Sequence, residues 1–287
     1  PAVLPRDPIT GAVVQNNWEF LPAFPMLGRL LMKVTGLPWE VAGLSISLVF
    51  GLLSMFVIFK MLPEVAPELC ARMTLVPYLA VAGLSLFPAA GIFSLAYPES
   101  MALFLILTAL LLIHRRTYLL ALIPVVLLGF TRPVALPIAA VVVWHALVRL
   151  RESSDLDSGR VPVRDWVSMA ILATLSAVSG LMWPIVCAIY TGVPDGFFLT
   201  QSAWRNGESS SVPFSGWVTP FEPLAFGIVA ILLVLGLAGA WFFTPRAAEF
   251  GNELRAWGLA YSIFMFAATS MNTGIFRYSL LIIVLPI

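Results

Sequence analysis

The sequence predicts an all-α integral membrane protein, a polytopic bundle of transmembrane helices. Hydrophobic residues make up 60% of the 287 positions and charged residues only 11%, whereas a soluble domain carries roughly 25% charged residues. The mean hydropathy of +0.96 agrees with a chain whose main solvent is lipid. The third observation is a series of long apolar runs, each a candidate span.

A helix needs about 20 apolar residues to cross the hydrocarbon core of a bilayer. The apolar stretch 117–148 is interrupted by Thr131-Arg132-Pro133, so we divide it into two short spans. We expect about 8–9 spans, eight complete and the last partial: 41–61, 73–96, 100–113, 118–130, 133–148, 166–190, 224–243, 257–269 and one that begins near Arg277.

The organisation predicted is a single transmembrane domain, 1–287, with an extracytoplasmic segment at 1–40 and a helical bundle at 41–287. Because the chain starts at Pro1 and stops inside an apolar run, 279–287, we expect a fragment truncated at both ends. Cys70 and Cys187 lie in a charged loop and an apolar run, so we expect two free thiols.

Orientation follows from the basic residues, which concentrate in cytoplasmic loops. When the loops are taken alternately, one set holds ten of the sixteen Lys and Arg residues, including the turn at Arg115 and Arg116 and the linker 149–165. We expect this set to face the cytoplasm of a multi-pass protein of the cell membrane. The Pro1 end then lies outside, together with the side on which a functional site is to be sought, and the net charge of +1 gives no reason to expect a nucleic-acid partner.

Two charged residues on the predicted outer side, Glu99 and Arg132, are candidate site residues. Glu99 follows Tyr97-Pro98, where an acid stabilises a helix start, but a carboxylate beside an aromatic ring also suits a sugar hydroxyl. Arg132 is either an interfacial residue whose side chain reaches toward water or a phosphate ligand with a planar fork of donors. An ion pair between Glu99 and Arg132 is a further possibility, because both lie on the same predicted face.

Two more outer segments combine aromatic and polar residues. Gln201, Trp204 and Arg205 are spaced i, i+3 and i+4, which places them on one face of a helical turn and suits a sugar phosphate. Arg277 and Tyr278 stand where a span begins, so Arg277 either anchors at the interface or joins the phosphate site.

Motifs of other enzyme classes are missing from the sequence. There is no Walker loop, dinucleotide fingerprint, zinc motif or nucleophile elbow. His114 and His145 have no metal-ligand companions nearby in the sequence, so we give both an ordinary structural role and predict no metal site.

Taken in order, the outer segments resemble the PIG-V family of membrane mannosyltransferases (GPI mannosyltransferase 2-like), in its actinobacterial form. The resemblance covers nearly the whole chain and rests on short motifs. Three motifs match best, and Gln201 with Trp204 and Arg277 with Tyr278 fit more loosely. The best three are Phe20-Leu21-Pro22-Ala23-Phe24-Pro25, Ala96-Tyr97-Pro98-Glu99-Ser100 and Thr131-Arg132-Pro133-Val134-Ala135.

The resemblance implies a GT-C-type fold and an inverting glycosyltransferase that takes mannose from a polyprenyl- or dolichyl-phosphate donor to a glycolipid or glycan acceptor. The donor and acceptor are substrates, so no cofactor is expected. The family's base, an Asp after the first transmembrane helix, would lie upstream of Pro1, which leaves Glu99 as a weak candidate base. Arg132, Arg205 and Arg277 would bind the donor phosphate, and the substrate-binding residues would be Tyr97, Glu99, Gln201, Trp204 and Tyr278.

Two alternatives come from other classes. A lipid or sugar transporter, including a flippase, would show internal repeats and polar residues at the middle of several spans; the sequence has no repeat and almost no mid-span charge. A non-catalytic membrane assembly subunit would lack the upstream Asp.

Overall fold

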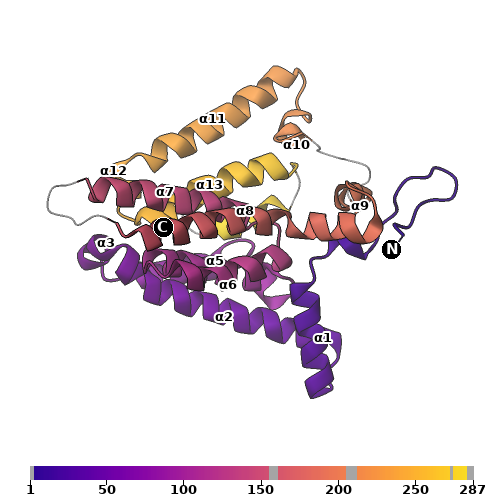
Figure 1. Ribbon diagram of the computed structural model, residues 1–287, viewed down its shortest axis with the longest axis horizontal. Helices are drawn as coiled ribbons and strands as arrows, with labels where there is room; N and C mark the ends of the chain where they lie inside the picture. The colour runs from indigo at the N-terminus through magenta and orange to yellow at the C-terminus, as the bar shows by residue number, and fades with distance from the viewer. Residues whose placement is uncertain (1–2, 155–160, 205–211, 272–273, 283–287) are drawn as a thin grey trace.

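The computed structural model describes residues 3–154, 161–204, 212–271 and 274–282 (Figure 1). Within these ranges the chain is helical and forms no strand, only an isolated bridge between Arg6 and Val13. The longer helices are α1 (Ala23–Thr35), α2 (Trp39–Val65), α4 (Val76–Leu86), α5 (Glu99–His114), α6 (Tyr118–Thr131), α7 (Leu136–Glu152), α8 (Val163–Thr191), α9 (Gly196–Trp204), α11 (Leu224–Phe242) and α13 (Asn252–Ala268).

Short helical segments connect these helices and complete the described chain. They are η1 (Asn17–Glu19), α3 (Pro67–Arg72), η2 (Ala90–Ser94), α10 (Ser215–Val218), α12 (Pro245–Ala248), α14 (Ile275–Ser279) and η3 (Leu280–Ile282).

Three helices in the described part of the chain, α2, α8 and α11, are long and apolar enough to cross a membrane. Each covers a run that the sequence predicts as a span, and together they agree with a helical membrane protein. The other predicted spans also contain helices, but these are shorter.

The predicted span 73–96 is not one continuous helix. Helix α4 ends at Leu86, and Phe87 takes an extended conformation with ψ of 140° before the chain continues into η2. Phe87 precedes Pro88, and the ring of a proline excludes the helical conformation from the residue before it. The prediction of an unbroken span was therefore wrong at its second half.

Helix α5 is the centre of the bundle. It is apolar around its circumference, which is typical of a helix enclosed by others, and Leu103, Leu107 and Leu110 are fully buried. It packs against α2, α6 and α13, while α6 and α7 both pack against α8.

Glycine allows α6 and α8 to approach closely. A Cβ atom at Gly129 would lie 2.5 Å from the carbonyl oxygen of Ser179, so only glycine fits there. Gly180 meets Leu136 of α7 in a similar way, with a Cβ atom placed 3.0 Å from the Leu136 backbone nitrogen. Small residues at such crossings are the usual device by which helices pack in membranes.

Successive helices of the bundle run in opposite directions, so helix ends alternate between the two ends of the bundle. Charged residues at these helix ends therefore form two groups. Glu99 and Arg132 stand at one end, where α5 begins and α6 finishes. The opposite end carries three exposed ion pairs: Arg72–Glu249, Arg115–Glu64 and Arg116–Glu152. We call these the Glu99 end and the basic end.

The N-terminal segment rests on α8 and α9 rather than extending freely. The Trp183 indole donates a hydrogen bond to the Trp18 carbonyl at 2.9 Å, and the Asn16 amide donates one to Thr200 at 3.1 Å. Pro25 lies inside the first turn of α1, a position where proline is tolerated.

Candidate functional site

The Glu99 end holds a buried carboxylate. Glu99 is the first residue of α5, and its residue exposure is 1%. Pro98 precedes it as the N-cap, so the carboxylate sits in the first turn, where the helix dipole favours negative charge. A buried carboxylate requires cationic or hydrogen-bonding partners.

Two arginines supply the cationic partners. One Nη of Arg132 hydrogen-bonds Oε1 of Glu99, and Nε of Arg277 lies 3.0 Å from the same oxygen. The Arg277 contact is an ion pair without a hydrogen bond, because Nε of Arg277 has no hydrogen-bond partner among the described residues. Oε2 of Glu99 likewise has none among them. We call Glu99, Arg132 and Arg277 the arginine–carboxylate centre.

The chain geometry explains the position of Arg132. This residue follows the last turn of α6 and adopts an extended conformation, with φ of −151° and ψ of 148°. Its neighbour Pro133 disfavours the helical conformation at position 132, so α6 stops at Thr131. The side chain therefore leaves the helix next to the start of α5, with 15% of its surface exposed.

Two tyrosine rings hold the guanidinium groups. The Arg277 guanidinium carbon lies 5.3 Å from the Tyr97 ring centre and 5.0 Å from that of Tyr278, and the Arg132 carbon lies 5.2 Å from Tyr278. These separations are typical of cation–π contacts. An Nη of Arg277 also donates a hydrogen bond to the Tyr278 hydroxyl at 3.1 Å. Each arginine is thus held by the charge of Glu99 and by contact with a tyrosine ring.

The electrostatic balance of the centre is positive. Burial is the largest influence on Arg132 and works against its charge, but the negative charge of Glu99, the hydrogen bond to it and the nearby Tyr261 and Tyr278 together hold the pKa of the Arg132 guanidinium above its ordinary value. One carboxylate and two guanidinium groups leave one net positive charge. A guanidinium has five N–H donors, so donors remain for an anion such as phosphate.

The structure brings together five of the predicted site residues: Tyr97, Glu99, Arg132, Arg277 and Tyr278. The sequence raised the pairing of Glu99 with Arg132, and the structure contains it. It likewise offered a place for Arg277 in the same site, and the structure puts that residue on the same carboxylate oxygen.

Gln201 and Trp204 occupy a different environment. Both lie on α9, and the Trp204 indole donates a hydrogen bond to the Asn16 carbonyl at 3.1 Å. Phe20 packs edge-on against the Trp204 ring, with centroids 5.4 Å apart. Within the described ranges, no hydrogen bond, ion pair or ring contact joins either residue to the arginine–carboxylate centre. Arg205 lies outside the described residues.

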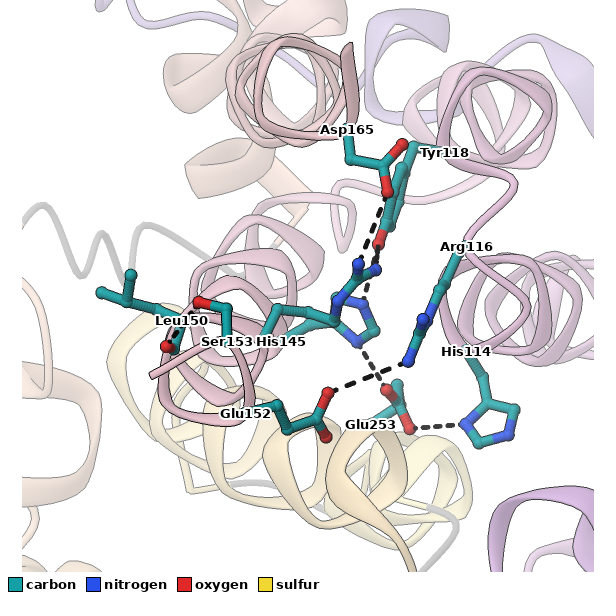
Figure 2. A network of polar contacts seen from close by, with 10 residues as sticks. His114, Arg116, Tyr118, His145, Leu150, Glu152, Ser153, Asp165 and Glu253 are labelled. Atoms are coloured by element: carbon teal, nitrogen blue, oxygen red, sulfur yellow. Dashed lines mark hydrogen bonds and ion pairs between the residues drawn. The ribbon is translucent and has the colours of Figure 1, made fainter. Parts of the chain in front are cut away.

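A second polar cluster lies at the basic end (Figure 2), and its acceptor is Glu253 in the first turn of α13. This carboxylate is 4% exposed; its Oε1 is 2.6 Å from Nδ1 of His145, and its Oε2 is 3.1 Å from Nδ1 of His114. The three side chains come from α5, α7 and α13, so the cluster joins three helices. We call it the Glu253 network.

The network continues from His145 to α6 and α8. Nε2 of His145 is 3.0 Å from the Tyr118 hydroxyl, which accepts a hydrogen bond from Arg149 at 3.0 Å. Since Arg149 can only donate, the tyrosine hydroxyl is free to donate to Nε2 of His145. That assignment places the imidazole proton on Nδ1, where it donates to Glu253. Another Nη of Arg149 lies 3.5 Å from Asp165.

Sequence reasoning missed the Glu253 network. We treated His114 and His145 as isolated, whereas both contact Glu253, which lies far along the chain from each. One local signal was present: His145 and Arg149 are separated by four residues and therefore share a face of α7. In the described part of the chain, no group of three or more His, Cys, Asp and Glu side chains is arranged to hold a metal ion.

The two clusters differ in what they offer chemically. The Glu253 network satisfies its own donors and acceptors, whereas the arginine–carboxylate centre keeps a net positive charge, spare donors and an unpaired carboxylate oxygen within the described ranges. The latter is the better candidate for a ligand. No family model, curated protein or solved structure matches the chain.

Proposed function

We propose that this protein is an inverting extracytoplasmic glycosyltransferase, with a GT-C-type bundle of eight or nine spans in the cell membrane. It would move a sugar, mannose according to the resemblance, from a polyprenyl-phosphate donor to a glycolipid or glycan acceptor. The observation that carries the proposal is the buried Glu99 carboxylate that holds Arg132 and Arg277 together.

Charge changes in the reaction fit this centre. A sugar linked to a lipid phosphate carries one negative charge on the phosphodiester. When the acceptor oxygen attacks the sugar carbon, the bond from that carbon to the phosphate oxygen breaks, and the leaving phosphate gains a second charge. Preorganised cationic donors stabilise such developing charge, and the planar fork of arginine suits phosphate oxygens.

Rigid placement of the donors also supports the proposal. The guanidinium groups of Arg277 and Arg132 lie over the rings of Tyr97 and Tyr278, which restricts their movement. Fixed donors contribute to catalysis because they need no reorganisation as charge develops. A mobile surface arginine would not give this advantage.

Glu99 fits a positioning and binding role better than that of the base. Its Oε1 is committed to the two arginines, while Oε2 has no hydrogen-bond partner among the described residues. An unmade hydrogen bond at a buried acceptor costs about 1–3 kcal/mol, and a substrate hydroxyl would remove that cost. The proton of the attacking hydroxyl then goes to another base, which the resemblance places upstream of Pro1.

The direct test is a transfer assay with the full-length protein purified in detergent. Radiolabelled polyprenyl-phosphate mannose and a panel of glycolipid and glycan acceptors are supplied, and labelled product is measured. We expect product with the sugar linkage inverted. No transfer under conditions in which a related enzyme works would overturn the proposal. If the protein, placed in vesicles, moved intact labelled lipid across the vesicle membrane without transfer, the result would favour a flippase.

Arginine variants connect the assay to the centre. Arg132→Ala and Arg277→Ala should each lower kcat at least about 100-fold, the effect of removing one preorganised donor. The matched control is Arg115→Ala, since Arg115 pairs with Glu64 at the basic end and is 49% exposed; its activity should remain. Full activity of a folded Arg132→Ala variant would remove this residue from the site.

A further inference from the structure

A groove opens on the side of the bundle near the basic end. It has a volume of about 770 Å³ and lies between α3 and α4 on one side and α11, α12 and α13 on the other. Its walls are largely apolar. They include Leu69, Met73, Val76, Ala238, Trp241, Phe250, Leu259 and Ile282.

The rim of the groove is charged and has an excess of arginine. Arg72 and Arg246 line it together with a single acid, Glu249. Arg72 pairs with Glu249 in an exposed ion pair. Arg246 is exposed, and its side chain makes no hydrogen bond or ion pair with any residue in the described ranges. One guanidinium group is therefore available to a negatively charged ligand.

Helix α11 gives the groove access to lipid. In Figure 1 this helix leans away from the other long helices toward its α10 end, and the α12 end remains close to the bundle. Only 11% of the apolar window of α11 is buried, and Leu233 and Leu237 are among its exposed side chains. In a membrane, an acyl chain beside α11 can enter the groove without crossing a polar barrier.

We propose that this groove is a binding site for one anionic phospholipid, with an acyl chain between α11 and α13 and the phosphate at Arg246 and Arg72. The volume lies within the range of about 300–1,000 Å³ that is usual for small-molecule sites. Basic pockets between helices on the cytoplasmic side of membrane proteins bind anionic headgroups. The inference depends on the membrane orientation predicted from the basic residues and is independent of the proposed glycosyl transfer.

Charge complementarity selects the kind of lipid. A zwitterionic headgroup carries its own cation and would place a second positive charge at a rim that already holds two arginines and one acid. An anionic headgroup brings no such cation. Each Lys or Arg near a membrane surface contributes a modest attraction to anionic lipid, so one arginine should change affinity several-fold rather than abolish binding.

The experiment measures lipid retention by native mass spectrometry of the full-length protein. Phosphatidylglycerol and phosphatidylcholine with identical acyl chains are titrated against it. We expect one phosphatidylglycerol to bind at least about fivefold more tightly, the effect of roughly one surface charge. Arg246→Ala should remove this preference, and Arg115→Ala should retain it. Ala238→Phe, which fills the groove, should weaken both lipids, whereas Leu237→Phe on the exposed face of α11 should weaken neither.

Several results would overturn the proposal. They are equal binding of the two lipids, an unchanged preference in Arg246→Ala, or displacement of phosphatidylglycerol by an equal concentration of polyprenyl phosphate. A crosslink from Ala238→Cys to another segment of the full-length chain or to a second copy would also assign the groove to protein. Transfer activity is measured on the same preparations, so loss of the lipid preference and loss of catalysis are separate readouts.

Discussion

Nε of Arg277 lies 3.0 Å from Oε1 of Glu99, although one residue follows α13 and the other begins α5. This contact requires α13 to run antiparallel to α5, so that the chain after α13 returns to the start of α5. The arginine–carboxylate centre is therefore formed only when the bundle is assembled. Loss of these contacts would therefore indicate a change in helix packing as well as a change in the site.

The first prediction concerns the cost of removing the carboxylate. Glu99→Gln leaves two partly buried guanidinium groups without their counter-charge, and breaking a buried ion pair from one side costs about 3 kcal/mol. We expect a corresponding loss of stability against heat, followed by tryptophan fluorescence in detergent. Glu68→Gln, an exposed acid on α3, is the matched control. If Glu99→Gln were as stable as the control, the contacts would contribute no net stability.

The second prediction concerns the Glu253 network. Glu253→Gln removes the charged acceptor shared by His114 and His145, so we expect a loss of about 1–3 kcal/mol in the free energy of unfolding. Tyr118→Phe removes only the hydroxyl at the other side of His145 and should cost less. Urea titration of both variants compares them, and a greater loss in Tyr118→Phe would contradict the arrangement.

The hydrogen-bond direction in this network is a third prediction. Because Arg149 donates to Tyr118, the hydroxyl should donate to Nε2 of His145 and leave the proton on Nδ1. Nitrogen-15 NMR of histidine-labelled protein distinguishes the two ring nitrogens. A His145 signal protonated only at Nε2 would reverse the assigned direction, and the signal disappears in His145→Gln as its control.

Much of the helical architecture could be predicted from the apolar runs, because lipid imposes a minimum length on each helix. The break after Leu86 could also have been predicted, since Pro88 restricts Phe87, but the apolar composition of the stretch concealed it. Pairing of Glu99 with Arg132 followed from topology alone: α5 and α6 are consecutive and antiparallel, so the beginning of one meets the end of the other.

The contacts of Glu253 could not be predicted in the same way. His114, His145 and Glu253 come from helices whose relative rotation about their axes is decided by packing, and the spacing of His145 from Arg149 on α7 does not point to Glu253. Trp204 illustrates a related limit. Its spacing from Gln201 fitted a binding face, yet its indole bonds to Asn16, because the path of the N-terminal segment over α9 is not encoded by local periodicity.

The contact between Gly129 and Ser179 restricts how this protein can move. The backbones of α6 and α8 are so near that a Cβ atom at position 129 would clash with Ser179, and we expect such close packing to resist sliding of one helix past the other. Gly236 on α11 has open space around it, and that helix is mostly uncovered. If the bundle must part to admit a lipid-sized substrate, we therefore expect α6 and α8 to stay together and α11 to move more easily.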